Sequence, residues 1–124
     1  SDLPMTAPAH IYARNEAASV TGRVAEGRAF VKAARLLDDL RGRPADTGLR
    51  DEAIAFNRVL WTAVQADVTD KQSPLPVHLK AGLLSLSLYA DRALTALRTS
   101  RDVAALEALI AVNRDVAGAL LATP

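Results

Sequence analysis

The stretch Phe56-Asn57-Arg58-Val59-Leu60-Trp61 decides the fold of this chain. It holds the only tryptophan and one of the two phenylalanines in a chain whose residues are 4% aromatic. It also sets an asparagine and an arginine inside an otherwise apolar run with helical spacing. None of these side chains forms a catalytic group in this arrangement. The stretch therefore predicts a helix that contributes a large anchor to a core.

The helix around this stretch is predicted from about Leu49 to Asp67, after a turn in which Asp46 or Thr47 caps it. A second row of apolar residues lies beside the main one, so the apolar face is broad. Such a face predicts contact with two neighbouring helices. The residues of the main stripe are Ile54, Asn57, Trp61, Val64 and Val68.

Helical periodicity also predicts a helix from about Glu16 to Arg41, which ends at Gly42, with a possible kink near Ser19–Gly22. A third helix is predicted from Leu75-Pro76 to about Thr99. Its run from Ala81 to Ala90 is the most apolar in the chain, so this helix is expected to be the buried hub of the bundle. Gly82 is expected to permit a close helix approach.

A fourth helix is predicted to open near Ser100 or Asp102. Four helical segments joined by connections of moderate length predict an all-α fold, a small antiparallel helical bundle. Residues 16–124 are expected to form a single helical domain. With 124 residues, the chain is long enough to bury one core without disulfides.

Residues 1–15 contain Pro4 and Pro8 and show little periodicity, which predicts a flexible N-terminal arm. Met5 follows Ser-Asp-Leu-Pro, so residues 1–4 are expected to be a remnant placed before the natural start. Tyr12 is the large side chain of the arm. Its ring either pins the arm to the body or contacts a partner.

Composition and motifs argue against several function classes. The chain has no cysteine, and its 15 basic and 14 acidic residues give a net charge of +1, so a general nucleic-acid binder is not expected. The apolar run in the third helix is shorter than the roughly 20 residues that span a bilayer. His10 and His78 lie far apart, without a metal-ligand pattern. No phosphate loop or nucleophile elbow occurs, so neither an enzyme nor a cofactor is expected.

Asn-Arg occurs twice, at Asn57-Arg58 and at Asn113-Arg114, each time with the asparagine in an apolar stripe. A buried amide is costly unless it is hydrogen-bonded, so each asparagine needs a partner. The two amides either fix how the helices pack or bind a partner. Trp61 is expected to be a core anchor rather than a ligand platform, and Arg58 is the better candidate for reaching a partner.

A short basic stripe runs along the first helix at Arg28, Lys32 and Arg35. Asp38 and Asp39 follow within one turn, which favours a solvated face. The alternative is a contact with an acidic partner or RNA.

Several motifs, in this order, resemble the FlaF family of flagellar biosynthesis regulators. The similarity extends from about Tyr12 to Leu121, and Lys80 stands where the family usually has arginine. The motifs are Asn57-Arg58-Val59-Leu60-Trp61, Asp67, Leu75-Pro76-Val77-His78-Leu79-Lys80-Ala81, Leu84-Ser85-Leu86, Leu109-Ile110-Ala111-Val112-Asn113-Arg114 and Gly118-Ala119-Leu120.

The resemblance implies a cytoplasmic protein that binds flagellin in the manner of a chaperone and promotes its synthesis and secretion during flagellum assembly. It implies a second regulator, FlbT, as a further partner. An exposed apolar groove is then expected. The alternatives are direct action on flagellin mRNA and a structural, self-associating adaptor. Candidates for partner contacts are Tyr12, Arg58, Trp61, Lys80 and Arg114.

Overall fold

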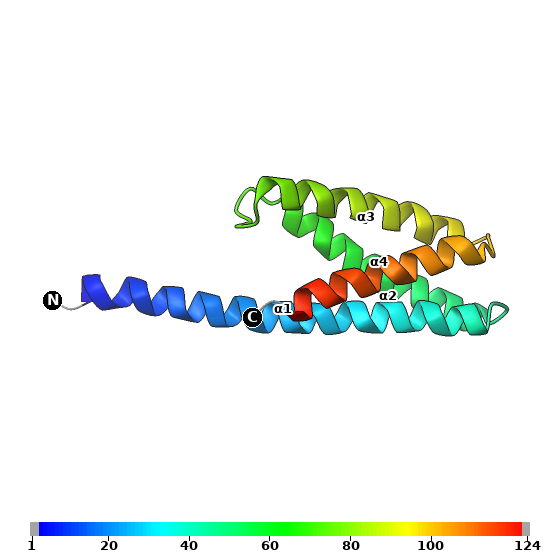
Figure 1. The fold of residues 1–124 in the computed structure, drawn as a ribbon, viewed down its shortest axis with the longest axis horizontal. Helices are drawn as coiled ribbons and strands as arrows, with labels where there is room; N and C mark the ends of the chain where they lie inside the picture. Colours follow the sequence, from blue (N-terminus) through cyan, green and yellow to red (C-terminus); the bar gives the residue numbers. More distant parts are fainter. Residues whose placement is uncertain (1–2, 123–124) are drawn as a thin grey trace.

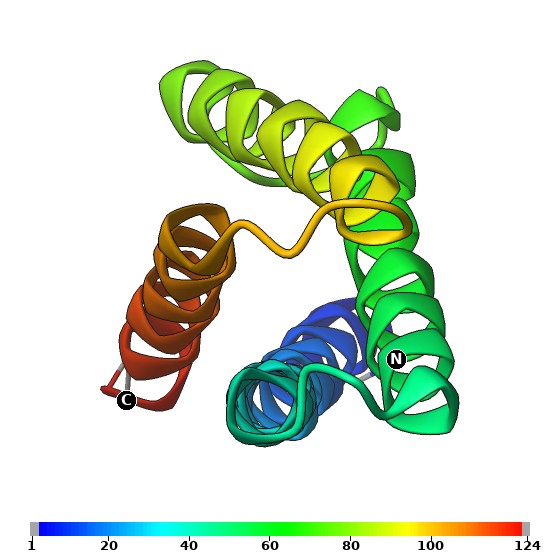
Figure 2. The same cartoon turned by 90° about the vertical axis from the view of Figure 1, so that its right-hand side faces the viewer.

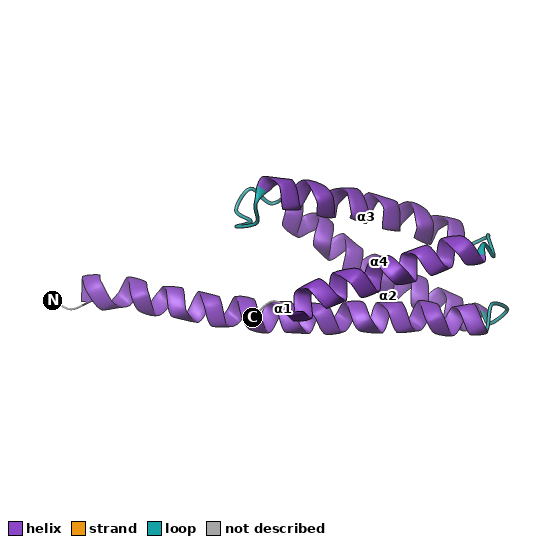
Figure 3. Cartoon of the chain, viewed as in Figure 1, coloured by secondary structure: helices purple, strands orange, loops and turns teal. Residues whose placement is uncertain are grey.

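The computed structural model describes the backbone of residues 3–122 and the side chains of residues 22–122. Over these residues the chain forms four α-helices and no strand, as Figure 3 shows. The helices alternate in direction along the bundle (Figure 1), which confirms the predicted all-α antiparallel architecture. Their bounds are α1 Leu3–Gly42, α2 Thr47–Thr69, α3 Val77–Leu97 and α4 Val103–Ala122.

Local side-chain chemistry fixes where the later helices begin. The carboxylate of Asp46 accepts a hydrogen bond from the backbone N–H of Leu49 at 2.9 Å and caps α2. Asp102 caps α4 in the same way, because its Oδ1 accepts from the N–H groups of Ala104 and Ala105. Pro76 stands immediately before α3, where its missing N–H costs nothing. The predicted starts of these helices are therefore correct to within three residues, and Asp102 rather than Ser100 is the cap of α4.

The start of α1 differs from the prediction. The helix begins at Leu3 rather than near Glu16, and it continues through Ser19–Gly22 without a break. In Figure 1 its N-terminal part projects beyond the other helices. The segment predicted as an arm therefore does extend from the bundle, but its backbone is helical. A helix that packs on no neighbour needs no apolar stripe, so periodicity gives no signal for it. The side chain of Tyr12 lies outside the described residues.

The hub of the bundle is α1 rather than α3. α1 packs along both α4 and α2, whereas α3 packs mainly on α2 and touches α4 only slightly. The fully buried residues of α3 lie in its C-terminal half, from Ser87 onward, while Val77 near its start is 80% exposed. Gly82 is exposed and approaches no other helix. The prediction that the third helix is the buried hub was therefore wrong. It relied on apolar composition, but the apolar residues of α3 surround the helix and only one side packs on α2.

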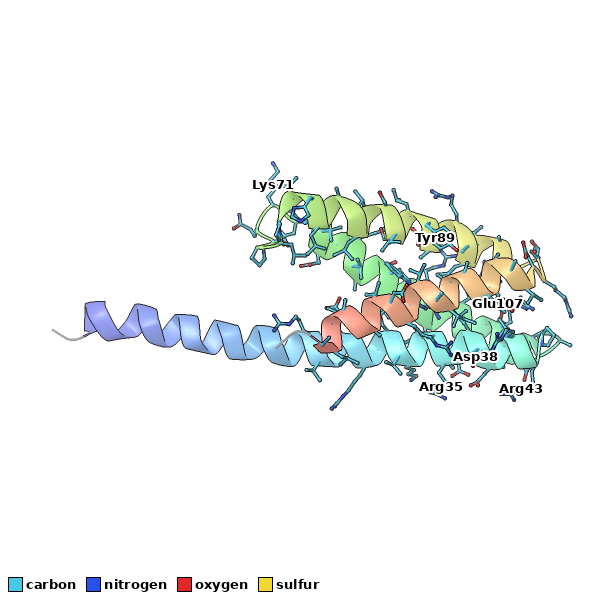
Figure 4. All side chains as sticks on the ribbon, viewed as in Figure 1. Arg35, Asp38, Arg43, Lys71, Tyr89 and Glu107 are labelled. Carbon is cyan, nitrogen blue, oxygen red and sulfur yellow. The ribbon has the colours of Figure 1, made fainter. Side chains whose placement is uncertain are left out.

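The two halves of the bundle diverge toward one end. In Figure 1 the α2–α3 pair separates from the α1–α4 pair toward the connection between α2 and α3. Figure 2, which faces the opposite end, shows the other two connections together there. Lys71 points outward from the α2–α3 connection in Figure 4 and marks the diverging end.

Arg50 joins two connections and a helix end at the end of the bundle opposite the diverging end. Its Nη1 donates hydrogen bonds to the carbonyl oxygens of Leu97 at 2.6 Å and Ser100 at 3.4 Å. Its Nη2 donates to the carbonyl of Pro44 at 2.8 Å. One guanidinium group thus joins the α1–α2 connection to the end of α3, and it satisfies carbonyls that lack helical partners.

Replacing Arg50 with alanine is expected to lower the free energy of unfolding by about 2 kcal/mol, because hydrogen bonds to a charged group contribute about 1.5–3 kcal/mol. Urea denaturation followed by circular dichroism measures the change. Arg101→Ala, which removes an exposed arginine from the neighbouring connection, should alter stability by less than about 0.5 kcal/mol. Equal effects of the two substitutions would show that Arg50 does not hold this end together.

A glycine lets the end of α4 lie against α1. A Cβ atom at Gly27 would lie 2.7 Å from Cγ of Leu121 and 3.4 Å from Cβ of Leu120. The first distance is too short for a Cβ contact, so a larger residue here would require the partly exposed side chain of Leu121 to move. Gly27 therefore provides the space that the Leu121 side chain occupies against α1.

Candidate partner-binding groove

An apolar groove opens at the diverging end of the bundle. It has a volume of about 460 Å³ and receives side chains from all four helices. Three polar side chains, Arg23, Glu26 and Asp67, also line it. Its apolar lining consists of Phe30, Val64, Val68, Leu75, Leu79, Leu83, Val116, Ala119 and Leu120.

The groove is the part of the core that the diverging helices leave unfilled. Along one face of α3, Leu94 and Leu97 are fully buried, Leu83 is half-buried and Leu79 is 43% exposed. Exposure on this face therefore rises toward the diverging end, where α3 lies apart from α4 in Figure 1. The helical spacing of these leucines places them on one face of α3, which runs from the core into the groove.

A buried polar network lies beneath the groove. Nδ2 of Asn113 donates a hydrogen bond to Oδ1 of Asn57 at 2.7 Å, and Nε1 of Trp61 donates to Oδ1 of Asn113 at 3.0 Å. Nδ2 of Asn57 donates to the carbonyl oxygens of Ala53 at 2.8 Å and Ala33 at 3.2 Å. Asn57, Trp61 and Asn113 are all 0% exposed. The structure therefore brings the two asparagines together and joins α1, α2 and α4 through them.

Trp61 connects this network to the groove through Phe30. The two rings pack edge to face, with centroids 5.1 Å apart and planes at 77°. Phe30 is fully buried and lines the groove, whereas Trp61 does not line it. Trp61 therefore lies in the core, and Phe30 forms the boundary between the core and the groove.

The structure does not bring the charged candidates for partner contacts together. Arg58 joins α2 to α3, with Nη2 donating to Oγ1 of Thr95 at 3.3 Å and Nη1 lying 3.9 Å from Oδ1 of Asp91. Arg114 instead joins α4 to α1, where its Nη2 lies 3.5 Å from Oδ2 of Asp38. Neither these arginines nor the half-buried Lys80 lines the groove.

The basic stripe on α1 is largely engaged in local contacts. Nη1 of Arg35 lies 3.9 Å from Oδ2 of Asp39, one turn further along the helix. Nζ of Lys32 lies 4.7 Å from the centre of the Phe56 ring, within range of a cation–π interaction. Arg35 projects away from the other helices in Figure 4. These contacts fit the solvated face better than a dedicated acidic or RNA partner.

The groove has a negatively charged edge that sequence reasoning did not single out. Glu26 comes from α1 and Asp67 from the last turn of α2. Glu26 as a whole is exposed, but partial burial of its carboxyl raises the pKa of that group above its ordinary value of 4.5, and the charge of Asp67 raises it further. The sequence carries one signal for Glu26, because it stands one helical turn before the core residue Phe30. Nothing in the sequence shows that it meets Asp67.

The raised pKa of Glu26 predicts a pH-dependent effect of Glu26→Gln. A carboxyl with a raised pKa in the folded state stabilises the fold below its unfolded pKa of 4.5, and this contribution is lost as the pH rises through the folded value. We therefore expect Glu26→Gln to raise Tm at pH 7 and the gain to disappear below about pH 4.5. Thermal unfolding between pH 4 and pH 8 measures it. The exposed Glu52→Gln should show no such trend, and a gain that persists at pH 4 would contradict the assignment.

Among the residues that the structure describes, no group of three or more His, Cys, Asp or Glu side chains could hold a metal ion. None of the helices there is long and apolar enough to cross a membrane.

The fold and the groove define a small all-α bundle with an unfilled apolar groove at one end. The sequence model of the family described as flagellar protein FlaF matches residues 8–120. The chain therefore belongs to the FlaF family, and its resemblance to that family is confirmed over almost its whole length. No curated protein and no solved structure matches it.

Proposed function

We propose that this protein binds flagellin in the manner of a chaperone and promotes its synthesis and secretion during flagellum assembly. The observation that carries the proposal is the apolar groove at the diverging end, where Leu79 and Leu83 of α3 remain partly exposed while Leu94 and Leu97, further along the same helix, are buried. Membership of a flagellar protein family supports flagellin as the occupant. The proposed site of action is the cytoplasm, with FlbT as a further partner.

The groove suits an amphipathic helix. Such a helix places apolar side chains every three or four residues in a hydrophobic groove, which is a common mode of peptide recognition. The terminal segments of flagellin are expected to be helical and amphipathic. A flagellin helix beside α3 would cover Leu79 and Leu83, which the other helices leave partly exposed. Cover of this kind would keep an export substrate from aggregating and could be removed without breaking a covalent bond.

Two substitutions on α3 test the proposal. Leu79 lines the groove and is 43% exposed, while Leu88 is 45% exposed on the same helix and does not line it. Leu79→Asp should weaken the binding of purified flagellin at least tenfold in isothermal titration calorimetry, because a carboxylate would be desolvated in the complex. Leu88→Asp should bind like the unsubstituted protein. Circular dichroism checks that both variants remain helical.

Other outcomes would favour the alternative functions. Equal loss of flagellin binding in both variants, or no binding by the unsubstituted protein, would contradict the groove proposal. Binding to flagellin mRNA with an affinity that falls steeply with salt would favour direct action on the message. A concentration-dependent dimer that Leu79→Asp dissociates would favour a self-associating adaptor.

A further inference from the structure

The polar side chains that line the groove come from two of the four helices. Arg23 and Glu26 come from α1 and Asp67 from α2, whereas the side chains that α3 and α4 contribute are apolar. Arg23 is already engaged in an interaction. The two carboxylates of the groove therefore come from different helices, and the parts of α3 and α4 that line it are entirely apolar.

We propose that Glu26 and Asp67 select the occupant of the groove, which is an amphipathic helix carrying a lysine or arginine at the border of its apolar face. This inference rests on the proposed function, since it specifies which kind of flagellin segment the groove takes. The apolar face of the helix lies against α3 and α4, and the basic side chain lies between the two carboxylates.

Charge complementarity supports a basic side chain at this position. The charge of Asp67 acts unfavourably on that of Glu26, and a positive charge close to both would relieve the repulsion. Asp67 stands two residues before the end of α2, where the helix dipole adds partial negative charge that also favours a cation. A lysine or arginine can lay its methylene groups along the apolar lining while its charged end reaches the carboxylates.

The same two carboxylates disfavour the wrong occupant. A helix with glutamate or aspartate at that position would place a third negative charge in a partly desolvated groove. Like-charge contacts of this kind exclude unsuitable partners more effectively than attraction alone. The apolar lining would then determine how tightly a helix binds. The two carboxylates would determine which helix is accepted.

A pair of near-isosteric substitutions tests the selection. The double variant Glu26→Gln/Asp67→Asn keeps the shape of the groove and removes both charges. We expect its affinity for purified flagellin to fall about five- to tenfold at low salt, and the salt dependence of binding to decrease. The matched control is Asp51→Asn/Glu52→Gln, which changes the net charge equally at exposed positions outside the groove. The control should bind like the unsubstituted protein.

Synthetic peptides separate this inference from the proposed function. Two 18-residue amphipathic helices would differ at one border position, which is lysine in one and glutamine in the other. The unsubstituted protein should bind the lysine peptide at least fivefold more tightly, and the double variant should bind both equally. Equal binding of the two peptides by the unsubstituted protein, or binding of neither, would overturn the selection. If flagellin binds with an affinity that the double variant does not change, the selection is wrong and the proposed function stands. If flagellin does not bind, the proposed function fails and the peptides alone decide the selection.

Discussion

Replacing Asn113 with leucine is expected to lower the free energy of unfolding by about 4 kcal/mol. The substitution removes the acceptor of Trp61 Nε1 and the donor to Asn57 Oδ1 at the same time. Both of these atoms belong to fully buried side chains, so water cannot replace the lost partner. Each buried polar group left unpaired costs about 1–3 kcal/mol, and the two costs add to a loss that could approach the total stability of a small domain.

The order of three variants provides the control. Asn57→Leu should cost less than Asn113→Leu. It leaves Nδ2 of Asn113 without its partner, whereas the carbonyl oxygens of Ala33 and Ala53 lose a bond to Asn57 but lie inside helices that still satisfy them. The double variant should be less destabilised than the sum of the single ones, since neither amide remains to be left unpaired and only Trp61 Nε1 lacks an acceptor. Urea denaturation followed by circular dichroism measures all three. Additive effects would mean that the amides act independently and that the network is not a unit.

Replacing Phe30 with alanine is expected to lower the free energy of unfolding by about 3–4 kcal/mol and to change the environment of Trp61. Phe30 is fully buried, packs edge-on against the Trp61 ring and forms part of the groove lining. The deleted ring would leave a cavity continuous with the groove, so water could approach the indole. We therefore expect a red shift of the Trp61 fluorescence in the folded protein, in addition to the loss of stability.

The neighbouring residue supplies a matched control for Phe30. Val31 is 49% exposed and lies outside the groove, so Val31→Ala should cost less than about 1 kcal/mol and leave the emission unchanged. Trp61 is the only tryptophan, so the spectrum reports this site alone. A destabilised Phe30→Ala variant with an unshifted emission maximum would show that Phe30 does not shield Trp61 from the groove.

The sequence predicted the second helix best. Every residue of its predicted stripe is buried, because a mixture of polar and apolar residues at a period of 3.6 identifies one face unambiguously. The same reasoning failed on α3, which was predicted to be the buried hub although its residues Val77 and Leu88 are exposed. A helix that is apolar on several sides offers no contrast, so its buried side depends on which neighbours reach it.

The groove could not be predicted because its lining comes from all four helices and depends on how they diverge. The need for a partner for each asparagine follows from the cost of burying an amide. That Trp61 joins the pair depends on side chains of α2 and α4 that meet in the centre of the bundle, which no local pattern encodes. The meeting of Glu26 and Asp67 likewise depends on the separation of two helices at one end of the bundle. A sequence pattern identifies the apolar face of one helix, whereas a site of this kind forms where the faces of several helices meet.

The pairing of α1 with α4 has a consequence for the newly made chain. The most extensive helix contact in the protein joins its first helix to its last. Since synthesis proceeds from the N-terminus, the apolar face of α1 waits for its main partner until translation is almost complete. Contacts between distant segments also form more slowly than local ones. Before α4 emerges, the unfinished protein exposes the apolar face of α1. The finished groove is proposed to cover an apolar helical face of the same kind in another protein.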